Sequence, residues 1–192
     1  MTGAAGGSGL AAGRLLVATP SLVDPNFANA VVLLLDHDDD GSLGVVLNRP
    51  SAITVASVLP DWAASVDPPE VLFEGGPVST DAALAVALVP DAGAADPIGF
   101  RRLFDRTGII DLDTPPEVLA PAINRMRVFA GYSGWGSGQL ESEIDEGSWY
   151  VVDATAHDIF HDEPGGLWSA VLRRQPGSLA WVSTRPADPT LN

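Results

Sequence analysis

The sequence predicts a mixed α/β fold: one domain whose sheet is partly antiparallel. Two apolar runs, at residues 30–35 and 43–47, flank a turn containing Asp40 and Gly41, a pattern typical of a β-hairpin. Further along, residues 127–152 contain a strand, a helix and a second strand in succession, which indicates an α/β unit. The chain contains no internal repeat and no linker long enough to force a second domain.

In the first half of the chain, short apolar runs alternate with proline and glycine, which end them. These runs predict strands at residues 14–18, 30–35, 43–47, 71–73 and 83–89. Thr54 is expected to cap a short helix that Pro60 ends. Asn48, Arg49 and Pro50 are expected to end the hairpin, and residues 91–99 to form a polar loop.

The second half of the chain is predicted to contain more helix. We expect strands at residues 109–112, 127–131 and 149–152, a glycine-rich turn at 131–138, and helical segments at 115–124, 139–146, 155–160 and 167–174. In the helix at 139–146, Leu140 and Ile144 share one face and acidic residues occupy the other. Residues 179–182 are expected to form an edge strand.

The composition is that of a soluble globular protein and excludes several classes of function. Of 192 residues, 46% are hydrophobic and 18% are charged, which excludes a disordered polymer. The net charge of −15 repels phosphate, so we do not expect direct binding to nucleic acid. The absence of cysteine excludes disulfides, thiolate nucleophiles and sulfur-ligated metal centres.

No segment of the sequence is typical of membrane insertion or export. The longest strongly apolar run, residues 30–35, is far shorter than the roughly 20 residues that cross a bilayer. Residues 1–13 are rich in glycine and alanine and have no basic start, so they indicate a disordered tail before a single domain at 14–192. We therefore expect a cytoplasmic protein that does not contact membranes.

Two patterns resemble metal sites, and both have a simpler interpretation. Residues 36–41 place three carboxylates at alternate positions before a glycine, like the start of a calcium loop, but the twelfth position is Leu47 instead of glutamate. His157 and His161 share a helix face, with Asp158 where a zinc protease has its glutamate base. The sequence favours acids at a hairpin tip and two solvent-facing histidines, and therefore no metal site.

The glycines after the predicted strand at 127–131 permit a nucleotide-binding interpretation. Gly134 and Gly136 match the first two positions of G-x-G-x-x-G, Gln139 occupies the third, and Asp153 follows at a ribose-binding distance. The helix that follows carries four acidic residues, which would repel phosphate. A close-packed turn is the favoured interpretation.

The same segment also approaches the G-x-S-x-G elbow of hydrolases. Ser133 would be the nucleophile, although Trp135 replaces the second glycine. His157 or His161 with Asp153 completes a triad in the required order, but at too short a spacing. A hydrolase or a nucleotide-binding enzyme that uses residues 131–139 is therefore the alternative to a non-enzymatic domain.

Two groups of arginines are the locally basic parts of the sequence. Arg101, Arg102 and Arg106 form one group, and Arg173 and Arg174 form the other. In so acidic a chain, we expect them to pair with the protein's own carboxylates instead of an acidic partner.

Four segments together carry a resemblance to a known family. They are GRLLVATPSLVDPNFANAVVLLLDHDDDGSLGVVLNRPS at 13–51, FEGGPVSTDAAL at 73–84, AGYSGWGSGQLESEIDEGSWYV at 130–151 and DPTLN at 188–192. In these segments and in their order, the chain resembles the YqgE/AlgH family of small bacterial proteins.

The resemblance implies a single α/β domain with a mixed, partly barrel-like sheet surrounded by helices. It implies no established enzymatic activity, only the label of transcriptional regulator. Members of the family can carry alanine at the position of Ser133 and do not require histidine at positions 157 and 161. This argues against the hydrolase and metal interpretations. An indirect regulatory role, through a protein or small-molecule partner, fits the negative charge better than direct DNA binding.

The favoured hypothesis is a non-enzymatic binding or regulatory domain without a cofactor. Segments of unusual backbone are expected to leave the carboxyl ends of strands, where open α/β sheets bind ligands. In this hypothesis Tyr132 and Trp135 stack on the ligand, Arg49 and Gln139 donate hydrogen bonds, and Glu141 restricts the ligand's charge. The predicted ligand-binding residues are Asn48, Arg49, Gly75, Gly76, Tyr132, Ser133, Trp135, Gln139 and Glu141.

Overall fold

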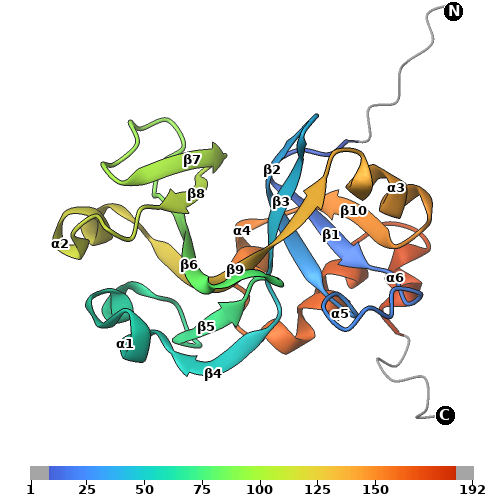
Figure 1. Ribbon diagram of the computed structural model, residues 1–192, viewed down its shortest axis with the longest axis horizontal. Coiled ribbons are helices and arrows are strands. Elements are labelled where there is room, and N and C mark those ends of the chain that lie inside the picture. Colours follow the sequence, from blue (N-terminus) through green and yellow to red (C-terminus); the bar gives the residue numbers. More distant parts are fainter. Residues whose placement is uncertain (1–8, 185–192) are drawn as a thin grey trace, which may run out of the picture.

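The computed structural model describes residues 9–184 and confirms a single mixed α/β domain (Figure 1). Within this range, ten strands form one curled, half-barrel sheet whose main path is β10-β1-β2-β3-β9-β6-β8-β7, with β4 and β5 attached at β9. The pairing of β5 with β9 is parallel, and the other pairings described are antiparallel. No helix in the described residues is long and apolar enough to cross a membrane.

The bounds of the elements are as follows. The strands are β1 (Arg14–Ala18), β2 (Val31–Asp38), β3 (Gly41–Val46), β4 (Pro50–Thr54), β5 (Val71–Glu74), β6 (Val78–Leu88), β7 (Phe100–Phe104), β8 (Thr107–Ile110), β9 (Arg125–Gly136) and β10 (Trp149–Asp153). The α-helices are α1 (Val55–Val58), α2 (Pro116–Leu119), α3 (Gln139–Asp145), α4 (Ala156–Ile159), α5 (Leu167–Arg173) and α6 (Leu179–Val182). The 3₁₀ helices are η1 (Pro60–Ser65), η2 (Ala120–Ala122) and η3 (Pro164–Gly166).

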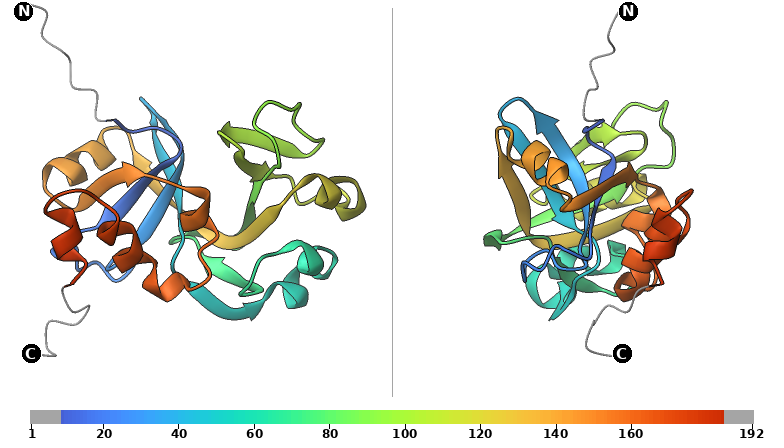
Figure 2. Two further views of the ribbon diagram at one scale, coloured as in Figure 1. Left: turned by 180° about the vertical axis from the view of Figure 1, so that it is seen from behind. Right: turned by 90° about the vertical axis from the view of Figure 1, so that its right-hand side faces the viewer.

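The molecule has two halves, and β9 runs through both (Figure 1). One half contains β1, β2, β3 and β10, which lie between α3 on one side and α5 and α6 on the other (Figure 2). The other half contains β4 to β8 with α1 and α2. We call them the helical half and the open half.

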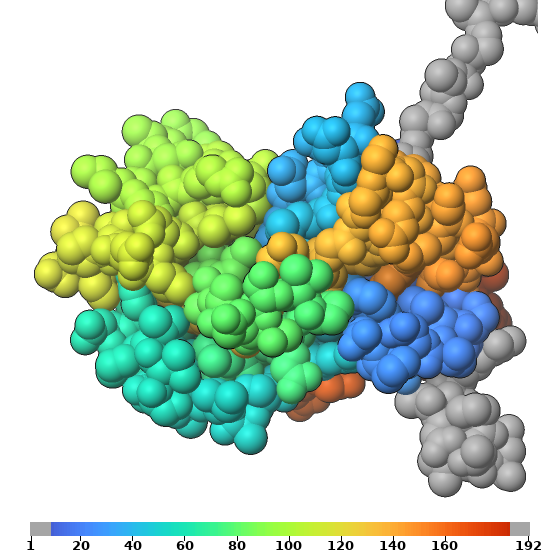
Figure 3. All heavy atoms as spheres, viewed as in Figure 1, coloured from blue at the N-terminus to red at the C-terminus, as the bar shows by residue number. Residues whose placement is uncertain are grey.

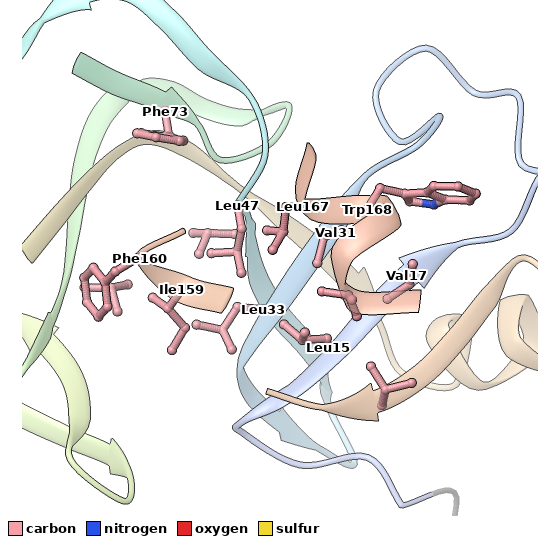
Figure 4. Packing of buried hydrophobic residues seen from close by; sticks show 14 of the residues in the cluster. Leu15, Val17, Val31, Leu33, Leu47, Phe73, Ile159, Phe160, Leu167 and Trp168 are labelled. Atoms are coloured by element: carbon pink, nitrogen blue, oxygen red, sulfur yellow. The ribbon is translucent and has the colours of Figure 1, made fainter. Parts of the chain in front are cut away.

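Strand β2 explains the layered core of the helical half. Its first five residues are all buried, as the continuous apolar run predicts for a strand covered on both faces. Val31, Leu33 and Leu35 pack into the cluster under α5, and Val32 and Leu34 pack into the cluster under α3. The first of these clusters reaches into the open half, and Figure 4 labels ten of its members: Leu15, Val17, Val31, Leu33, Leu47, Phe73, Ile159, Phe160, Leu167 and Trp168.

A buried arginine connects three further segments to β9. Arg127 is 1% exposed, and its guanidinium donates hydrogen bonds to the carbonyls of Ile159 at 2.9 Å and Pro68 at 3.0 Å. The guanidinium also lies 4.4 Å from the centre of the Phe73 ring. Because burial removes water from the charged group, the pKa of Arg127 falls to about 10. Arg127 therefore fixes the segments at Pro68 and Ile159 against the centre of the sheet.

The predicted glycine turn after residue 131 is wrong, because this segment belongs to β9. Residues up to Tyr132 pair with β6, and Ser133 to Gly136 pair with β3. A side chain at Gly131 would lie 2.7 Å from the carbonyl oxygen of Gly76. This glycine therefore serves close strand packing. The turn into α3 lies later, at Gly138, whose φ is +71°.

Three other predictions of secondary structure differ from the structure, and one strand was not predicted. Strand β4 begins at Pro50, which was expected to end the hairpin; β4 pairs with β5 alone, and a proline is tolerated on an edge strand. The polar loop predicted at 91–99 contains no strand or helix, and the strand β7 that follows it was not predicted. The predicted helix at 115–124 divides into α2 and η2. Residues 179–182 form α6 instead of an edge strand, and the helical spacing of Leu179 and Val182 lets both pack on the core.

Part of each predicted terminal segment lies outside the described residues. The described residues do not include residues 1–8 of the expected tail or the DPTLN segment at 188–192. Within the described part, Leu10 packs against the cluster under α3, and the Gly13 N–H donates to the carbonyl of Leu34 at 3.0 Å.

The close approach of β5 to β9 predicts a steric requirement at Gly75. In Gly75→Ala, the new Cβ would lie 2.3 Å from the carbonyl oxygen of Gly131, so the backbones must separate. We expect a loss of about 3 kcal/mol in the free energy of unfolding, measured by urea denaturation. Gly165→Ala is the control, because a Cβ there has no atom within 4 Å. Equal stability of the two variants would contradict the prediction.

Candidate functional site

A pocket of about 320 Å³ lies where β4, the β5–β6 connection and the loop before β2 meet. In Figure 3 these segments are cyan, green and blue, and they adjoin at the front of the molecule. We call this the central pocket. Its lining residues are Asn26, Val46, Arg49, Ser51, Ile53, Leu72, Glu74, Gly76, Pro77, Thr80 and Ala130.

The apolar part of the central pocket comes from β9 and from the two strands that pair with it here, β3 and β5. Val46 ends β3, Leu72 lies in β5 and Ala130 lies in the middle of β9. Val46 and Leu72 are 1% and 5% exposed, so both are anchored in the core. The backbone holds these strands together, since the Val46 N–H donates to the Gly75 carbonyl at 2.9 Å. The apolar lining is therefore preformed.

Arg49 forms part of the wall of the central pocket. Its guanidinium donates hydrogen bonds to the carbonyls of Asn26 and Ala28, the second at 3.0 Å. Asn48 supports the same loop: its side-chain oxygen accepts from the Val31 N–H at 3.0 Å, and its amide donates to the Asn29 carbonyl at 2.8 Å. Arg49 therefore lines the pocket, whereas Asn48 acts on the loop behind it.

Gly75, Gly76, Tyr132 and Ser133 come together through their backbones. A Cβ on Gly76 would lie 2.3 Å from the carbonyl carbon of Tyr132, and the Ser133 hydroxyl donates to the Gly75 carbonyl at 3.0 Å. Ser133 is 0% exposed and lies in the middle of a strand. The backbone here therefore forms neither the hydrolase elbow nor the G-x-G-x-x-G turn, the two alternatives to a close-packed turn, because both need a strand that ends before these residues.

Trp135 and Gln139 lie in the helical half, away from the central pocket's lining. Trp135 is 5% exposed, and its ring centre lies 5.9 Å from that of Phe27 and 6.1 Å from that of Trp149. One carboxylate oxygen of Glu143 accepts from the indole N–H groups of Trp135, at 3.0 Å, and Trp149, at 2.8 Å. The other oxygen accepts from the Gln139 amide at 3.0 Å. Trp135 is thus a core residue rather than an exposed stacking platform.

Glu141 and the hairpin tip form an acidic surface at the other end of β3. Glu141 lies 3.6 Å from the His37 imidazole. Asp38 accepts from the backbone N–H groups of Asp40 and Gly41, at 2.8 and 3.2 Å, as expected for a hairpin tip. Among residues 9–184, no group of three or more histidine or acidic side chains is placed to hold a metal ion.

His157 lies in α4 and His161 lies two residues beyond its end, so they do not share a helix face as expected, but their rings pack with centres 5.0 Å apart. Asp158 between them is 1% exposed and accepts from the Thr155 N–H at 2.7 Å, which completes a capping box. It also forms an ion pair with Arg174. Asp158 therefore caps a helix and is not free to act as a base for a metal-bound water.

Several arginines of the two basic groups are used within the protein. Arg102 pairs with Asp96 at 2.7 Å, and Arg174 pairs with Asp158. Arg106 donates to the carbonyl of Pro90 at 3.2 Å. Pairing with the protein's own carboxylates is thus confirmed for Arg102 and Arg174.

The β4 side of the central pocket was not predicted from the sequence. Ser51 and Ile53 line the pocket from alternate positions of β4, and Glu74 ends β5 beside them. The alternation of Ser51 and Ile53 is only weak evidence for a strand, and Pro50 before it argued against one.

The comparisons with known proteins agree with this fold. A family model described as AlgH-like matches residues 15–180. The chain belongs to the AlgH-like family. A UPF0301 protein of Streptomyces coelicolor is 57% identical over 182 residues, which cover 94% of this chain and 94% of the relative. A UPF0301 protein of Mycobacterium tuberculosis is 45% identical over 94% of this chain and 90% of the relative.

Two solved structures share the fold of this AlgH-like chain. The crystal structure of protein DIP2367 from Corynebacterium diphtheriae is similar with a TM-score of 0.86 and 34% identity, over 92% of this chain and 93% of that one. The solution structure of the AlgH protein from Pseudomonas aeruginosa is similar with a TM-score of 0.68 and 25% identity, over 97% and 98%. The family resemblance and the half-barrel sheet are therefore confirmed.

The carboxylate shared by two indoles predicts a stability role for Glu143. In Glu143→Ala, the N–H groups of Trp135 and Trp149 lose their acceptor while both rings stay almost fully buried. We expect a loss of about 2–4 kcal/mol in the free energy of unfolding, measured by urea denaturation with tryptophan fluorescence. Glu146→Ala, an exposed change just after the same helix, should stay near the wild type. A Glu143→Ala variant as stable as the wild type would show that the shared carboxylate is dispensable.

Proposed function

We propose that this AlgH-like chain is a non-enzymatic binding or regulatory domain, which acts through a small-molecule or protein partner held in the central pocket. One observation carries the proposal. Arg49 and Glu74 line the same pocket, and no ion pair joins them in the described residues. The pocket therefore offers a cation and an anion that do not neutralise each other by direct contact.

The remaining hydrogen-bonding capacity of these two side chains favours a dipolar ligand. A guanidinium has five N–H bonds, and Arg49 uses one on each of its two terminal nitrogens for the loop carbonyls, which leaves three. The Glu74 carboxylate accepts no hydrogen bond from the described residues. Together with the apolar residues of the same lining, the two side chains suit a small molecule or chain end that has an apolar body and both an amino and a carboxylate group.

The lining of the central pocket favours binding over catalysis. It contains no histidine, and Glu74 is its sole carboxylate, so it holds no pair of acids for general acid and base catalysis. Ser51 is the one serine in the lining, and its hydroxyl accepts from the Ile53 N–H at 3.1 Å. For the regulatory role, the net charge favours an indirect action over contact with DNA, and we place this action in the cytoplasm.

The proposal predicts selective binding of apolar amino acids. We expect free L-leucine and L-phenylalanine to bind at least about tenfold more tightly than their N-acetyl and amide derivatives, each of which lacks one charge. Titration of the isotope-labelled protein, followed by NMR, should shift the backbone signals of Val46, Leu72 and Ala130. The absence of shifts at these residues for every amino acid tested would refute the proposal.

A charge substitution distinguishes the effect of the carboxylate in the pocket from the effect of the protein's net negative charge. Glu74→Gln should weaken binding of the free amino acids and of the amide derivatives, which carry the amino group, and leave the N-acetyl derivatives unchanged. Asp145→Asn in α3 removes the same charge from an exposed position outside the pocket lining and is the matched control. Equal effects of the two substitutions would contradict a direct role for Glu74.

A further inference from the structure

A second concave surface lies at the far end of the open half, where α1 and α2 are found (Figure 1). It is a groove of about 500 Å³, and it shares no lining residue with the central pocket. We call it the α1–α2 groove. Its lining residues are Val58, Leu59, Pro60, Asp61, Trp62, Leu112, Asp113, Thr114, Pro115, Pro116 and Glu117.

The two walls of the α1–α2 groove are held together by Trp62. This side chain is 2% exposed, and its indole N–H donates to the carbonyl of Leu112 at 3.2 Å, across the groove's two sequence segments. Prolines at positions 60, 115 and 116 restrict the backbone of both walls. The groove is therefore preformed, and a partner that enters it orders little of this protein.

The groove is acidic, and nothing in its walls neutralises it. Asp61, Asp113 and Glu117 are exposed, and none of them forms an ion pair in the described residues. The segments 50–66 and 111–124, which build both walls, contain no arginine or lysine. The carboxylates therefore face solvent as a local excess of negative charge.

Apolar side chains accompany this charge. Val58 lines the groove and is 50% exposed, and Val118, next to Glu117, is 52% exposed. Neither valine is covered by another segment of the described structure. An occupant that satisfies both features must carry positive charge and apolar surface together.

We propose that the α1–α2 groove is a docking surface for a cationic segment of a partner protein, in which apolar residues alternate with arginine or lysine. A second copy of this chain fits less well, because Arg101 and Arg173 are the only exposed arginines without an ion pair among its described residues. In the described residues Arg14, Arg102, Arg125 and Arg174 form ion pairs within the protein, and Arg127 is buried. A metal ion alone fits poorly as well, because it would leave the exposed valines uncovered.

The test uses a short blocked peptide that alternates arginine and leucine, titrated into the isotope-labelled full chain. We expect the NMR shifts to centre on residues 58–62 and 112–118, and the affinity to fall at least about tenfold between about 20 mM and about 300 mM salt. A peptide with glutamate in place of arginine should not bind. The absence of binding by the arginine peptide, or shifts centred elsewhere, would overturn the proposal.

Two pairs of variants separate local docking from the overall negative charge. Asp113→Asn with Glu117→Gln should weaken peptide binding at least about tenfold, while Asp145→Asn with Glu146→Gln in the helical half removes the same charge and should change it less than about twofold. Val58→Ser should weaken binding, whereas Val23→Ser, at a site 81% exposed, should not. Equal losses in the members of either pair would overturn the proposal.

The same protein samples decide between the partner and a second copy. Sedimentation equilibrium without peptide should show a monomer whose mass does not depend on the charges of the groove. Self-association that Asp113→Asn with Glu117→Gln abolishes would overturn the proposal in favour of a second copy. Because the groove and the central pocket share no residue, the amino-acid titrations and the peptide titrations can fail independently.

Discussion

The contact between β9 and the Gly75–Gly76 segment is the constraint on which the rest of the structure depends. At Tyr132 and Ser133, β9 changes its pairing from β6 to β3, and side chains on the two glycines would collide with its backbone. The Gly75 N–H donates to the Ala130 carbonyl and the Gly75 carbonyl accepts from the Val46 N–H, both at 2.9 Å. Three strands are thereby fixed at one point, and the central pocket lies beside it.

The distribution of charge follows from how few basic residues the protein has. Ten arginines face 25 acidic residues, and the structure places several arginines where they hold segments together. Arg49 holds the loop before β2, and Arg127 holds the segments at Pro68 and Ile159. Because these cations are used inside the fold, whole stretches of the surface, such as the walls of the α1–α2 groove, keep their carboxylates unpaired.

The fold was more predictable from the sequence than the site, for a physical reason. Because β2 is buried on both faces, its sequence is a continuous apolar run, which can be recognised without knowledge of distant contacts. The turn residues after it support the prediction of a hairpin. The glycines of β9 are harder to interpret. A glycine indicates that a side chain is not tolerated at its position, but the sequence does not tell whether a turn or a neighbouring strand is the cause. Arg49 was included among the candidate residues because a charge next to a strand end is visible in the local sequence. Ser51 and Glu74 were missed because only the pairing of β4 with β5 brings them to the pocket.

The two halves of the molecule differ in how much of their apolar surface is covered. In the helical half, helices cover both faces of the sheet, and the aromatic residues Phe27, Trp135 and Trp149 are used in packing. The open half has fewer helices, and four of the six most exposed large apolar side chains lie there: Ile53, Val58, Ile98 and Val118. The same lack of helical cover that leaves these side chains in solvent also leaves room for the central pocket and the α1–α2 groove, so this half is where binding partners should be sought.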